Sequence, residues 1–280
     1  MSQSKRHIQD LLARAGLSPR HRLGQNFMID QNLVRLVADA GRVAAGDLVI
    51  EVGPGTGTLT EELLSRGARV VAVEIDRDLA ALLKEQFADH ERFSLIHGDA
   101  LAGKHALNPQ LLSAAHRGRP KLVANLPYNI ASPLVVELLI AGVELLAFTV
   151  QKEVADRLAA GPATDAYGPL GVMVQSLARV EVLRTLGPEA FWPRPKIESA
   201  LVRLTRDDSL GAEARAVGAM VARLFSARRK MLRSALARIA DAATPALAAV
   251  EAMGIRPDSR AEELSPAQIV KLFRSIHPAV

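Results

Sequence analysis

The feature that most constrains the fold is a short apolar run that leads directly into a glycine-rich turn. Residues 48–52 (Leu-Val-Ile-Glu-Val) are followed by Gly53-Pro54-Gly55-Thr56-Gly57. An almost wholly apolar run is typical of a buried parallel strand, and the leucine spacing that follows favours a helix over residues 58–65. Strand, glycine turn and helix in this order predict part of a βαβ unit that holds a ligand at the turn.

The same alternation of apolar runs and helical patterns continues to residue 150. We expect further strands at residues 69–73, 93–96, 121–124 and 145–150, and helices at residues 58–65, 78–87 and 133–140. Beyond them, residues 151–159 and 171–178 favour helices, and two closing antiparallel strands are expected at residues 180–185 and 199–205. The pattern predicts an α/β fold with a mixed, mostly parallel sheet. The proline-stiffened segment 191–196 is expected to be irregular.

A polar break at residues 206–209 marks the predicted domain boundary. We assign residues 1–207 to the sheet domain, with a basic N-terminal arm over residues 1–28 that includes a short helix at residues 7–15. Residues 208–280 are predicted to form a small all-helical domain. Its expected helices cover residues 212–225, 230–240, 245–253 and 266–275.

The distribution of charge indicates a polyanionic partner. The net charge is only +5, but residues 1–35 hold 6 basic and 2 acidic side chains, and residues 206–280 hold 12 and 8. The segment between residues 36 and 148 holds 10 basic and 14 acidic side chains. An acidic middle between two basic ends fits a polyanion held from both sides, although basic residues on solvated faces give the same counts.

Composition also excludes several classes of protein. The chain has no cysteine, which excludes disulfides, thiolate metal sites and cysteine nucleophiles. No run approaches the ~20 apolar residues of a membrane span, and the first ten residues are polar and basic. We therefore expect a cytoplasmic protein with no membrane partner.

Polar residues stand where three successive predicted strands end. Glu74, Asp99 and Asn125 follow the second, third and fourth strands. The carboxyl ends of parallel strands form the ligand-binding edge of an open α/β sheet, and an acid at the place of Glu74 can accept ribose hydroxyls. Each residue alone could equally be a helix cap. The turn lacks both the third glycine of the dinucleotide fingerprint and the phosphate-loop lysine, and Glu51 suits a cationic ligand.

The segment Asn125-Leu126-Pro127-Tyr128 fits chemistry on the exocyclic amine of a base. Such chemistry needs acceptors for the amine protons and a flat face for an extruded base. Asn125 offers an amide oxygen, Pro127 leaves neighbouring carbonyls free to accept, and Tyr128 offers a ring. The same four residues also make an ordinary turn after a strand.

The chain resembles S-adenosylmethionine-dependent methyltransferases, and more closely the bacterial ribosomal small-subunit RNA adenine dimethyltransferases of the KsgA type. The matching segments lie in order along nearly the whole chain: residues 24–27 (GQNF), 51–60, 73–76 (VEID), 97–100 (HGDA), 125–130 (NLPYNI), 151–155 (QKEVA), 167–170 (YGPL), 191–203 and 225–232 (FSARRKML). Met28 stands where similar proteins often have Leu. The resemblance implies a Rossmann-like methyltransferase sheet, S-adenosyl-L-methionine as the methyl donor and no metal.

The resemblance also implies roles for individual residues. The donor is expected to contact Gln25, Asn26, Met28, Glu51, Gly53, Gly55, Glu74, Asp99 and Asn125. The target adenine is expected to meet the Asn125 amide, the backbone at Leu126 or Pro127, and the stacking rings of Tyr128 and Phe191. RNA phosphates are expected at Arg20, Arg22, Arg194, Lys196, Arg223, Arg228, Arg229, Lys230 and Arg233. The basic run 223–238 is otherwise typical of a solvated helical face.

The implied reaction is N6-dimethylation of two adjacent adenosines in a hairpin near the 3′ end of 16S ribosomal RNA. The implied partner is the immature small ribosomal subunit, met by a monomer. Three alternatives stay open: a large-subunit RNA methyltransferase of the macrolide-resistance type, an assembly factor whose binding outweighs its catalysis, and a DNA adenine methyltransferase.

Overall fold

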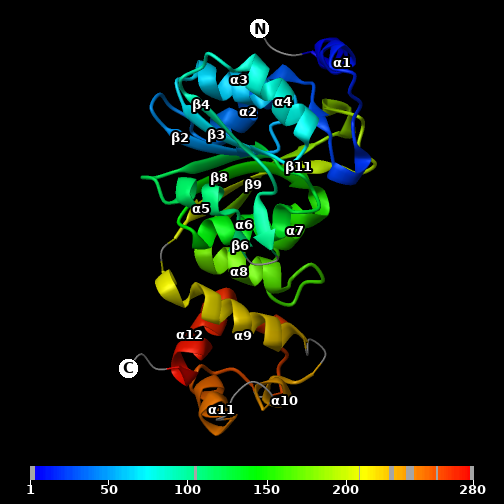
Figure 1. Cartoon of the computed structure of the whole chain (residues 1–280). Coiled ribbons are helices and arrows are strands. Elements are labelled where there is room, and N and C mark those ends of the chain that lie inside the picture. The colour runs from blue at the N-terminus through cyan, green and yellow to red at the C-terminus, as the bar shows by residue number, and fades with distance from the viewer. Residues whose placement is uncertain are drawn as a thin grey trace. The chain divides into compact units, whose positions relative to one another are not determined.

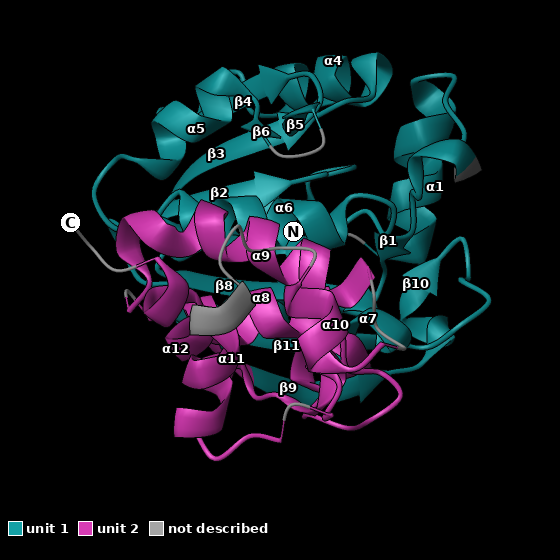
Figure 2. Cartoon of the chain, turned by 90° about the horizontal axis from the view of Figure 1, so that it is seen from below, with its two compact units in different colours: residues 1–155, 181–206 teal, residues 156–180, 207–280 magenta. Residues whose placement is uncertain are grey.

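The chain divides into two compact units, shown in teal and magenta in Figure 2. The first contains residues 1–155 and 181–206, and the second contains residues 156–180 and 207–280. The division differs from the predicted boundary at residue 207 by adding residues 156–180 to the C-terminal unit. The computed structural model describes residues 4–103, 106–207, 209–226, 230–237, 243–256 and 258–277.

A mixed seven-stranded sheet is the centre of the first unit (Figure 1). In sheet order its strands are β4 (Phe93–His97), β3 (Arg69–Glu74), β2 (Leu48–Val52), β7 (Lys121–Asn125), β8 (Leu145–Gln151), β11 (Ser199–Arg206) and β9 (Ala178–Leu186). The first five strands are mutually parallel, and β11 pairs antiparallel with β8. The predicted mixed, mostly parallel α/β sheet is therefore confirmed.

Helices cover both faces of the parallel strands, which explains why those strands are apolar throughout. On one face lie α2 (Gln31–Ala40), α3 (Thr58–Ser65) and α4 (Arg77–Gln86), and on the other lie α5 (Pro109–Ala115) and α6 (Ala131–Ile140) (Figure 1). Every residue from Leu145 to Val150 is buried. Helix α2, helix α5 and the small hairpin β5–β6 (Leu101–Gly103 and Ala106–Leu107) were not predicted from the sequence.

The N-terminal arm is tied to a segment that we expected to be irregular. Helix α1 (Lys5–Arg14) and the turn η1 (His21–Leu23) precede strand β1 (Phe27–Met28), which pairs antiparallel with β10 (Phe191–Trp192). The prediction for residues 191–196 is wrong at its first two residues. The prolines, which lack a backbone donor, begin only at residue 193, so the two residues before them can still pair.

The described part of the second unit is mainly helical. Its helices include α8 (Pro169–Leu177), α9 (Ala214–Ser226), α10 (Leu232–Leu236), α11 (Ala243–Ala252) and α12 (Pro266–Ile276), while α7 (Lys152–Ala159) begins in the first unit. Tyr167 lies wholly buried, and its hydroxyl donates to the carbonyl of Leu264 at 2.7 Å. The predicted C-terminal helices are found, except that helix α10 is shorter than the expected 230–240, of which residues 238–240 lie outside the described residues.

Candidate active site

A pocket opens at the carboxyl ends of the parallel strands in the first unit. The chain passes from β2 to β3 and β4 on one side and from β7 to β8 on the other, so the sheet order reverses between β2 and β7. Ligands bind at such a reversal in open α/β sheets. The pocket walls come from the glycine turn, four strand ends and the arm, including residues 23–28, 51–56, 73–75, 98–100 and 125–130 in part.

The glycine turn is shaped by the ring of Phe27. Gly53 and Gly55 have φ angles of 72° and 61°, which disfavour any residue with a Cβ. A Cβ on Gly55 would stand 2.8 Å from Cε1 of Phe27, and one on Gly53 would stand 3.1 Å from Cγ of Pro127. The backbone of the turn therefore packs closely against Phe27 of the arm and against Pro127, which leaves no room for larger residues at Gly53 and Gly55.

Two buried carboxylates lie in the pocket wall. Glu51 is 2% exposed and accepts a hydrogen bond from Oγ1 of Thr60 at 2.6 Å. Burial raises the pKa of Glu51 to about 8; the negative charge of Glu74 adds to the rise, and the Thr60 hydrogen bond opposes it. Burial likewise raises the pKa of Glu74 to about 7, although the backbone N–H groups of Asp76 and Gly55 donate to its oxygens at 2.8 Å and 3.3 Å. A cationic ligand would favour the ionised form of both.

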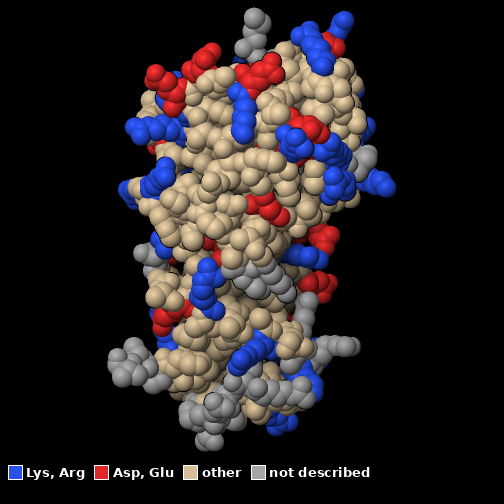
Figure 3. All heavy atoms as spheres, in the orientation of Figure 1, with Lys and Arg blue, Asp and Glu red and all other residues tan. Residues whose placement is uncertain are grey.

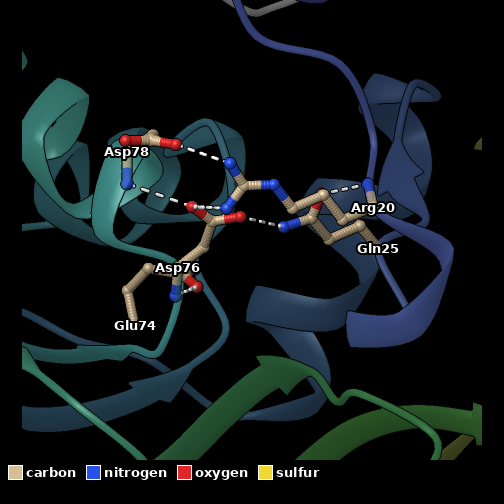
Figure 4. A network of polar contacts seen from close by, with 5 residues as sticks. All are labelled: Arg20, Gln25, Glu74, Asp76 and Asp78. Atoms are coloured by element: carbon tan, nitrogen blue, oxygen red, sulfur yellow. Dashed lines mark hydrogen bonds and ion pairs between the residues drawn. The ribbon is translucent and has the colours of Figure 1, made fainter.

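A chain of polar contacts connects Glu74 to the N-terminal arm (Figure 4). Asp76 is 4% exposed, caps helix α4 and receives Nη1 of Arg20 at 2.9 Å and Nε2 of Gln25 at 3.0 Å. Nη2 of Arg20 donates to Asp78 at 2.6 Å, and the backbone N–H of Arg20 donates to Oε1 of Gln25 at 2.7 Å. Both polar atoms of the Gln25 amide are therefore engaged by the protein.

The amide of Asn125 is held from both sides. Its Nδ2 donates to the backbone carbonyl of Asn26 at 2.6 Å, and its Oδ1 accepts a hydrogen bond from the hydroxyl of Thr149 on the adjacent strand β8. Because the carbonyl of Asn26 can only accept, the amide nitrogen must face it. The oxygen keeps a second lone pair for a further donor.

The rings of Tyr128 and Phe191 differ in their surroundings. The Tyr128 side chain is half-buried, and its hydroxyl is 2.7 Å from Oγ of Ser199. Phe191 is 2% exposed and lies in the hydrophobic core with Met28 and Leu33. Stacking of a base on Phe191 therefore stays a prediction that requires its ring to be uncovered, whereas Tyr128 already adjoins the pocket residue Pro127.

Asp99 lies at the pocket rim beyond strand β4. It is exposed, and its Oδ1 accepts from the backbone N–H of Leu101 at 2.9 Å, at the start of the β5–β6 hairpin. The backbone carbonyl of Asp99 also accepts from Nδ2 of Asn108 at 3.1 Å. The hairpin and its hydrogen bonds fix this acid at the rim of the pocket.

The predicted RNA-binding residues are spread over both units. In the first, Arg22 and Lys196 are exposed, and Arg194 is 70% exposed with Nη2 3.7 Å from Glu189. In the second, the exposed members are Arg223, Lys230 and Arg233. Arg228 and Arg229 lie outside the described residues. On the face in Figure 3, basic side chains gather at the upper right, where Figure 1 draws helix α1 and the N-terminal arm.

Four residues that complete the site were missed by sequence reasoning. Asp76 could have been found, because an acid directly before a helical pattern is an N-cap signal. Thr60, Thr149 and Ser199 carry no local signal, since each meets its partner only after the strands and helices have packed.

Neither a metal cluster nor a membrane span occurs within the described residues. No group of three or more His, Asp or Glu side chains among them is placed to hold a metal ion. None of the helices in the described ranges is long and apolar enough to cross a membrane.

The chain is similar to known proteins over most of its length. A "Ribosomal RNA small subunit methyltransferase A" from Methylococcus capsulatus is 42% identical over 265 residues, covering 93% of this chain and 98% of that protein. One of the same description from Streptomyces coelicolor is 39% identical over 275 residues, covering 95% and 93%.

Solved structures show the same fold. A 23S rRNA methyltransferase, ErmE, matches with a TM-score of 0.66 and 27% identity, covering 90% of this chain and 100% of that one. A dimethyladenosine transferase from Plasmodium falciparum matches with a TM-score of 0.74 and 22% identity, covering 88% and 95%. The family model described as "Ribosomal RNA adenine dimethylase" matches residues 16–277, and the chain therefore belongs to the ribosomal RNA adenine dimethylase family.

Proposed function

We propose that this enzyme transfers methyl groups from S-adenosyl-L-methionine to N6 of two adjacent adenosines in a hairpin near the 3′ end of 16S ribosomal RNA. The observation that carries the proposal is the pocket in which Glu74, the glycine turn and the doubly held amide of Asn125 meet. Similarity to small-subunit methyltransferases at about 40% identity supports the choice of subunit.

The pocket fits the methyl donor. The Glu74 carboxylate accepts backbone hydrogen bonds from Gly55, Ile75 and Asp76, and one of its roughly four lone-pair sites is left for a ribose hydroxyl. Asp99 at the rim is proposed to accept from the adenine amine, and the backbone at Gly53 and Gly55 to meet the methionine part. Glu51 is proposed to face the sulfonium region, because a buried carboxyl with a raised pKa is stabilised in its ionised form by a nearby cation. The arm residues Gln25, Asn26 and Met28 complete the enclosure.

When bound, the donor supplies an electrophilic methyl group on a positively charged sulfur. The protein's part is to orient the target amine, whose lone pair is conjugated into the base. The free lone pair of Asn125 Oδ1 and the backbone carbonyl at Leu126 or Pro127 are proposed to accept the two amine protons. That geometry directs the nitrogen lone pair at the methyl carbon, so the N–C bond forms as the C–S bond breaks and one amine proton leaves to solvent. Catalysis is then mostly proximity and orientation.

The RNA grip is proposed to use exposed cations of both units, with Tyr128 stacking on the extruded base. The helical segment 208–280 acts as an RNA-binding domain in this proposal, and Arg22, Arg194 and Lys196 contact phosphates beside the pocket. Phosphate contacts position the substrate, while the pocket selects adenine. The partner is the immature small subunit in the cytoplasm, and the enzyme acts as a monomer.

Mass spectrometry of RNA methylated by the protein in vitro tests the proposal. We expect two dimethyladenosines in the 3′ hairpin of 16S RNA when immature small subunits are supplied. Modification of large-subunit RNA or of DNA alone would refute it. A separate comparison addresses the assembly-factor alternative: if the Glu74→Ala variant loses methylation but leaves subunit assembly normal in cells, binding is the dominant role.

A further inference from the structure

Arg20 stood among the predicted phosphate contacts, yet its guanidinium is already occupied within the protein. It donates to Asp76 at 2.9 Å and to Asp78 at 2.6 Å, two carboxylates at the start of helix α4 (Figure 4). One positive charge therefore faces two negative ones. A phosphate placed at this guanidinium would also meet the carboxylate of Asp78, which is unfavourable for binding a polyanion.

The contacts of Arg20 close a ring with Gln25. The Arg20 backbone donates to the Gln25 amide oxygen, the Gln25 amide nitrogen donates to one oxygen of Asp76, and the Arg20 side chain donates to the other. The ring fixes which way the Gln25 amide points, because a flipped amide would set its nitrogen against an N–H and its oxygen against a carboxylate. Gln25 lines the donor pocket, so the ring fixes part of the pocket wall.

The ring also reaches Glu74. The backbone N–H of Asp76 donates to Oε1 of Glu74 at 2.8 Å, while the side chain of Asp76 carries the contacts to Arg20 and Gln25. Asp76 has only 4% of its surface exposed, so removing its cationic partner leaves a nearly buried charge less compensated. A change at Arg20 is thereby transmitted to the carboxylate proposed to hold the donor ribose.

Arg20 lies at one end of the segment that walls the pocket. At the other end, Phe27 and Met28 pair with β10, and Phe27 packs with Ile8, Leu12 and Leu79. Residues 23–28 between these two anchors all line the pocket. The segment is thus fixed by strand pairing at its C-terminal end and by Arg20 at its N-terminal end.

We propose that Arg20 is a positioning residue for the methyl donor, which fixes the arm over the pocket through Asp76, Asp78 and Gln25, and is not an RNA contact. The proposal rests on the proposed function, since it takes S-adenosylmethionine as the ligand of this pocket. It predicts that donor affinity depends on Arg20 and that RNA affinity does not.

The test measures donor binding by calorimetry without RNA, and RNA binding and kcat separately. For Arg20→Ala we expect the Kd for S-adenosylmethionine to rise ~10-fold, because two charge-assisted hydrogen bonds and the ring are removed. At saturating donor, kcat and the Kd for 16S RNA should stay within about twofold, because bound donor stabilises the arm over the pocket and every proposed phosphate contact keeps its charge. Arg20→Lys keeps the charge but not the two-pronged geometry, so it should restore only part of the affinity.

Arg22→Ala is the matched control, because it removes the same charge from the same arm. Arg22 is exposed, and no ion pair to it is found in the described part of the chain. It should lower RNA affinity and leave donor affinity unchanged. Asp78→Asn should raise the donor Kd less than Arg20→Ala, since the Asp78 side chain is 43% exposed.

Hydrogen exchange separates a local role from general loss of structure. In Arg20→Ala without donor, amides of residues 20–26 should exchange faster while those of helix α4 and strand β3 do not change. The proposal is overturned if Arg20→Ala weakens RNA binding with donor affinity intact, or if exchange rises uniformly over the first unit in both Arg20→Ala and Arg20→Lys. If the unsubstituted chain binds no S-adenosylmethionine, the proposed function itself has failed.

Discussion

The two units hold their candidate functional residues in opposite ways. In the first unit Glu51 and Glu74 are almost wholly buried, and the Asn125 amide is bonded at both of its polar atoms. In the second unit Arg223, Lys230 and Arg233 are exposed. Buried polar groups are nearly always hydrogen-bonded within the protein, so the fold fixes their orientation and limits which ligand atoms they can contact. The fold places exposed charges on a surface but leaves their contacts open, and these contacts form only when a partner molecule binds.

The largest contrast is expected between the two predicted stacking residues, Phe191 and Tyr128. Replacing Phe191 should mainly lower stability, and replacing Tyr128 should mainly lower activity. Phe191→Ala should cost ~3–5 kcal/mol of stability, because a core phenyl ring is removed. Tyr128→Ala should cost far less stability but lower kcat/KM by roughly 10–100-fold, because the extruded base no longer stacks on a ring. Urea denaturation and methylation kinetics measure the two effects. A stable Phe191→Ala protein with the kinetic defect of Tyr128→Ala would show that Phe191 is uncovered and stacks.

The next largest effect is expected at Glu74. Glu74→Ala removes the acceptor proposed for the donor ribose and should raise the Kd for S-adenosylmethionine by roughly 100-fold or more, since each hydrogen bond to a charged group contributes ~1.5–3 kcal/mol. Calorimetry measures the change, and RNA affinity should not move. Glu85→Ala, which removes an exposed acid from helix α4, is the control and should leave donor affinity intact.

The raised pKa of Glu51 makes donor binding depend on pH. Glu51 is mostly protonated below about pH 8 in the free chain, whereas a sulfonium favours its ionised form. The Kd for S-adenosylmethionine should therefore fall as pH rises from 6 to 8, by up to ~10-fold per unit, and level off above. Glu51→Gln should make this profile shallower, chiefly between pH 7 and 8, whereas Glu74, whose pKa is raised to about 7, still titrates in both proteins. Titration of the ligand contributes equally to both profiles, because the same ligand is used. If the Kd of the unsubstituted chain and of Glu51→Gln depends on pH in the same way, Glu51 does not contact the sulfonium.

Glu51 should also affect stability in the absence of donor. Its pKa is raised from 4.5 to about 8 in the folded chain, so the folded state binds the proton more tightly than the unfolded state. Its contribution is most favourable below pH 4.5 and disappears as pH rises from there to about 8. Glu51→Gln should therefore raise the melting temperature at pH 8 more than at pH 5. Melting curves at the two pH values measure the difference.

The same contrast explains what could be predicted from the sequence. Strand ends at Glu74 and Asn125 were predictable, because apolar periodicity locates parallel strands and topology brings their carboxyl ends together. The Thr149 contact to Asn125 was not, since it depends on the register of β8 beside β7. Likewise, the sequence showed that Arg20 is basic but could not show that two acids 56 and 58 residues away neutralise it.

For the basic residues of the second unit, the structure adds little to what the sequence predicts. Both place Arg223, Lys230 and Arg233 on the exposed surface, and in the structure Arg223 lies in α9, Arg233 in α10 and Lys230 in the bend before α10. No ion pair to these three residues is found within the described residues. The solvated-face interpretation and the RNA-contact interpretation of Arg223, Lys230 and Arg233 predict the same fold. Only a measurement that involves a polyanion separates the two.

The smallest expected effect distinguishes the solvated-face interpretation from the RNA-contact interpretation. Replacing Arg223, Lys230 and Arg233 together by Ala should weaken 16S RNA binding several-fold at ~0.1 M salt. It should also reduce the slope of log affinity against log salt by up to ~0.7–0.9 for each phosphate that the variant no longer neutralises. The Kd for S-adenosylmethionine should stay unchanged, because these residues belong to the second unit and the pocket to the first.

A matched triple variant tests whether placement or total charge matters. Arg69, Lys84 and Arg117 are exposed cations of the first unit. They lie at or near the edge of the sheet opposite the pocket: Arg69 starts β3, Lys84 is in the last turn of α4, and Arg117 precedes β7. Their replacement removes the same charge and should leave the salt slope unchanged. Equal weakening in both triples would mean that affinity follows net charge alone. If RNA affinity falls only in the variant of Arg223, Lys230 and Arg233, these exposed cations contact particular RNA phosphates. Their partners would then come from the RNA, whereas the partners of the buried carboxylates come from the protein itself.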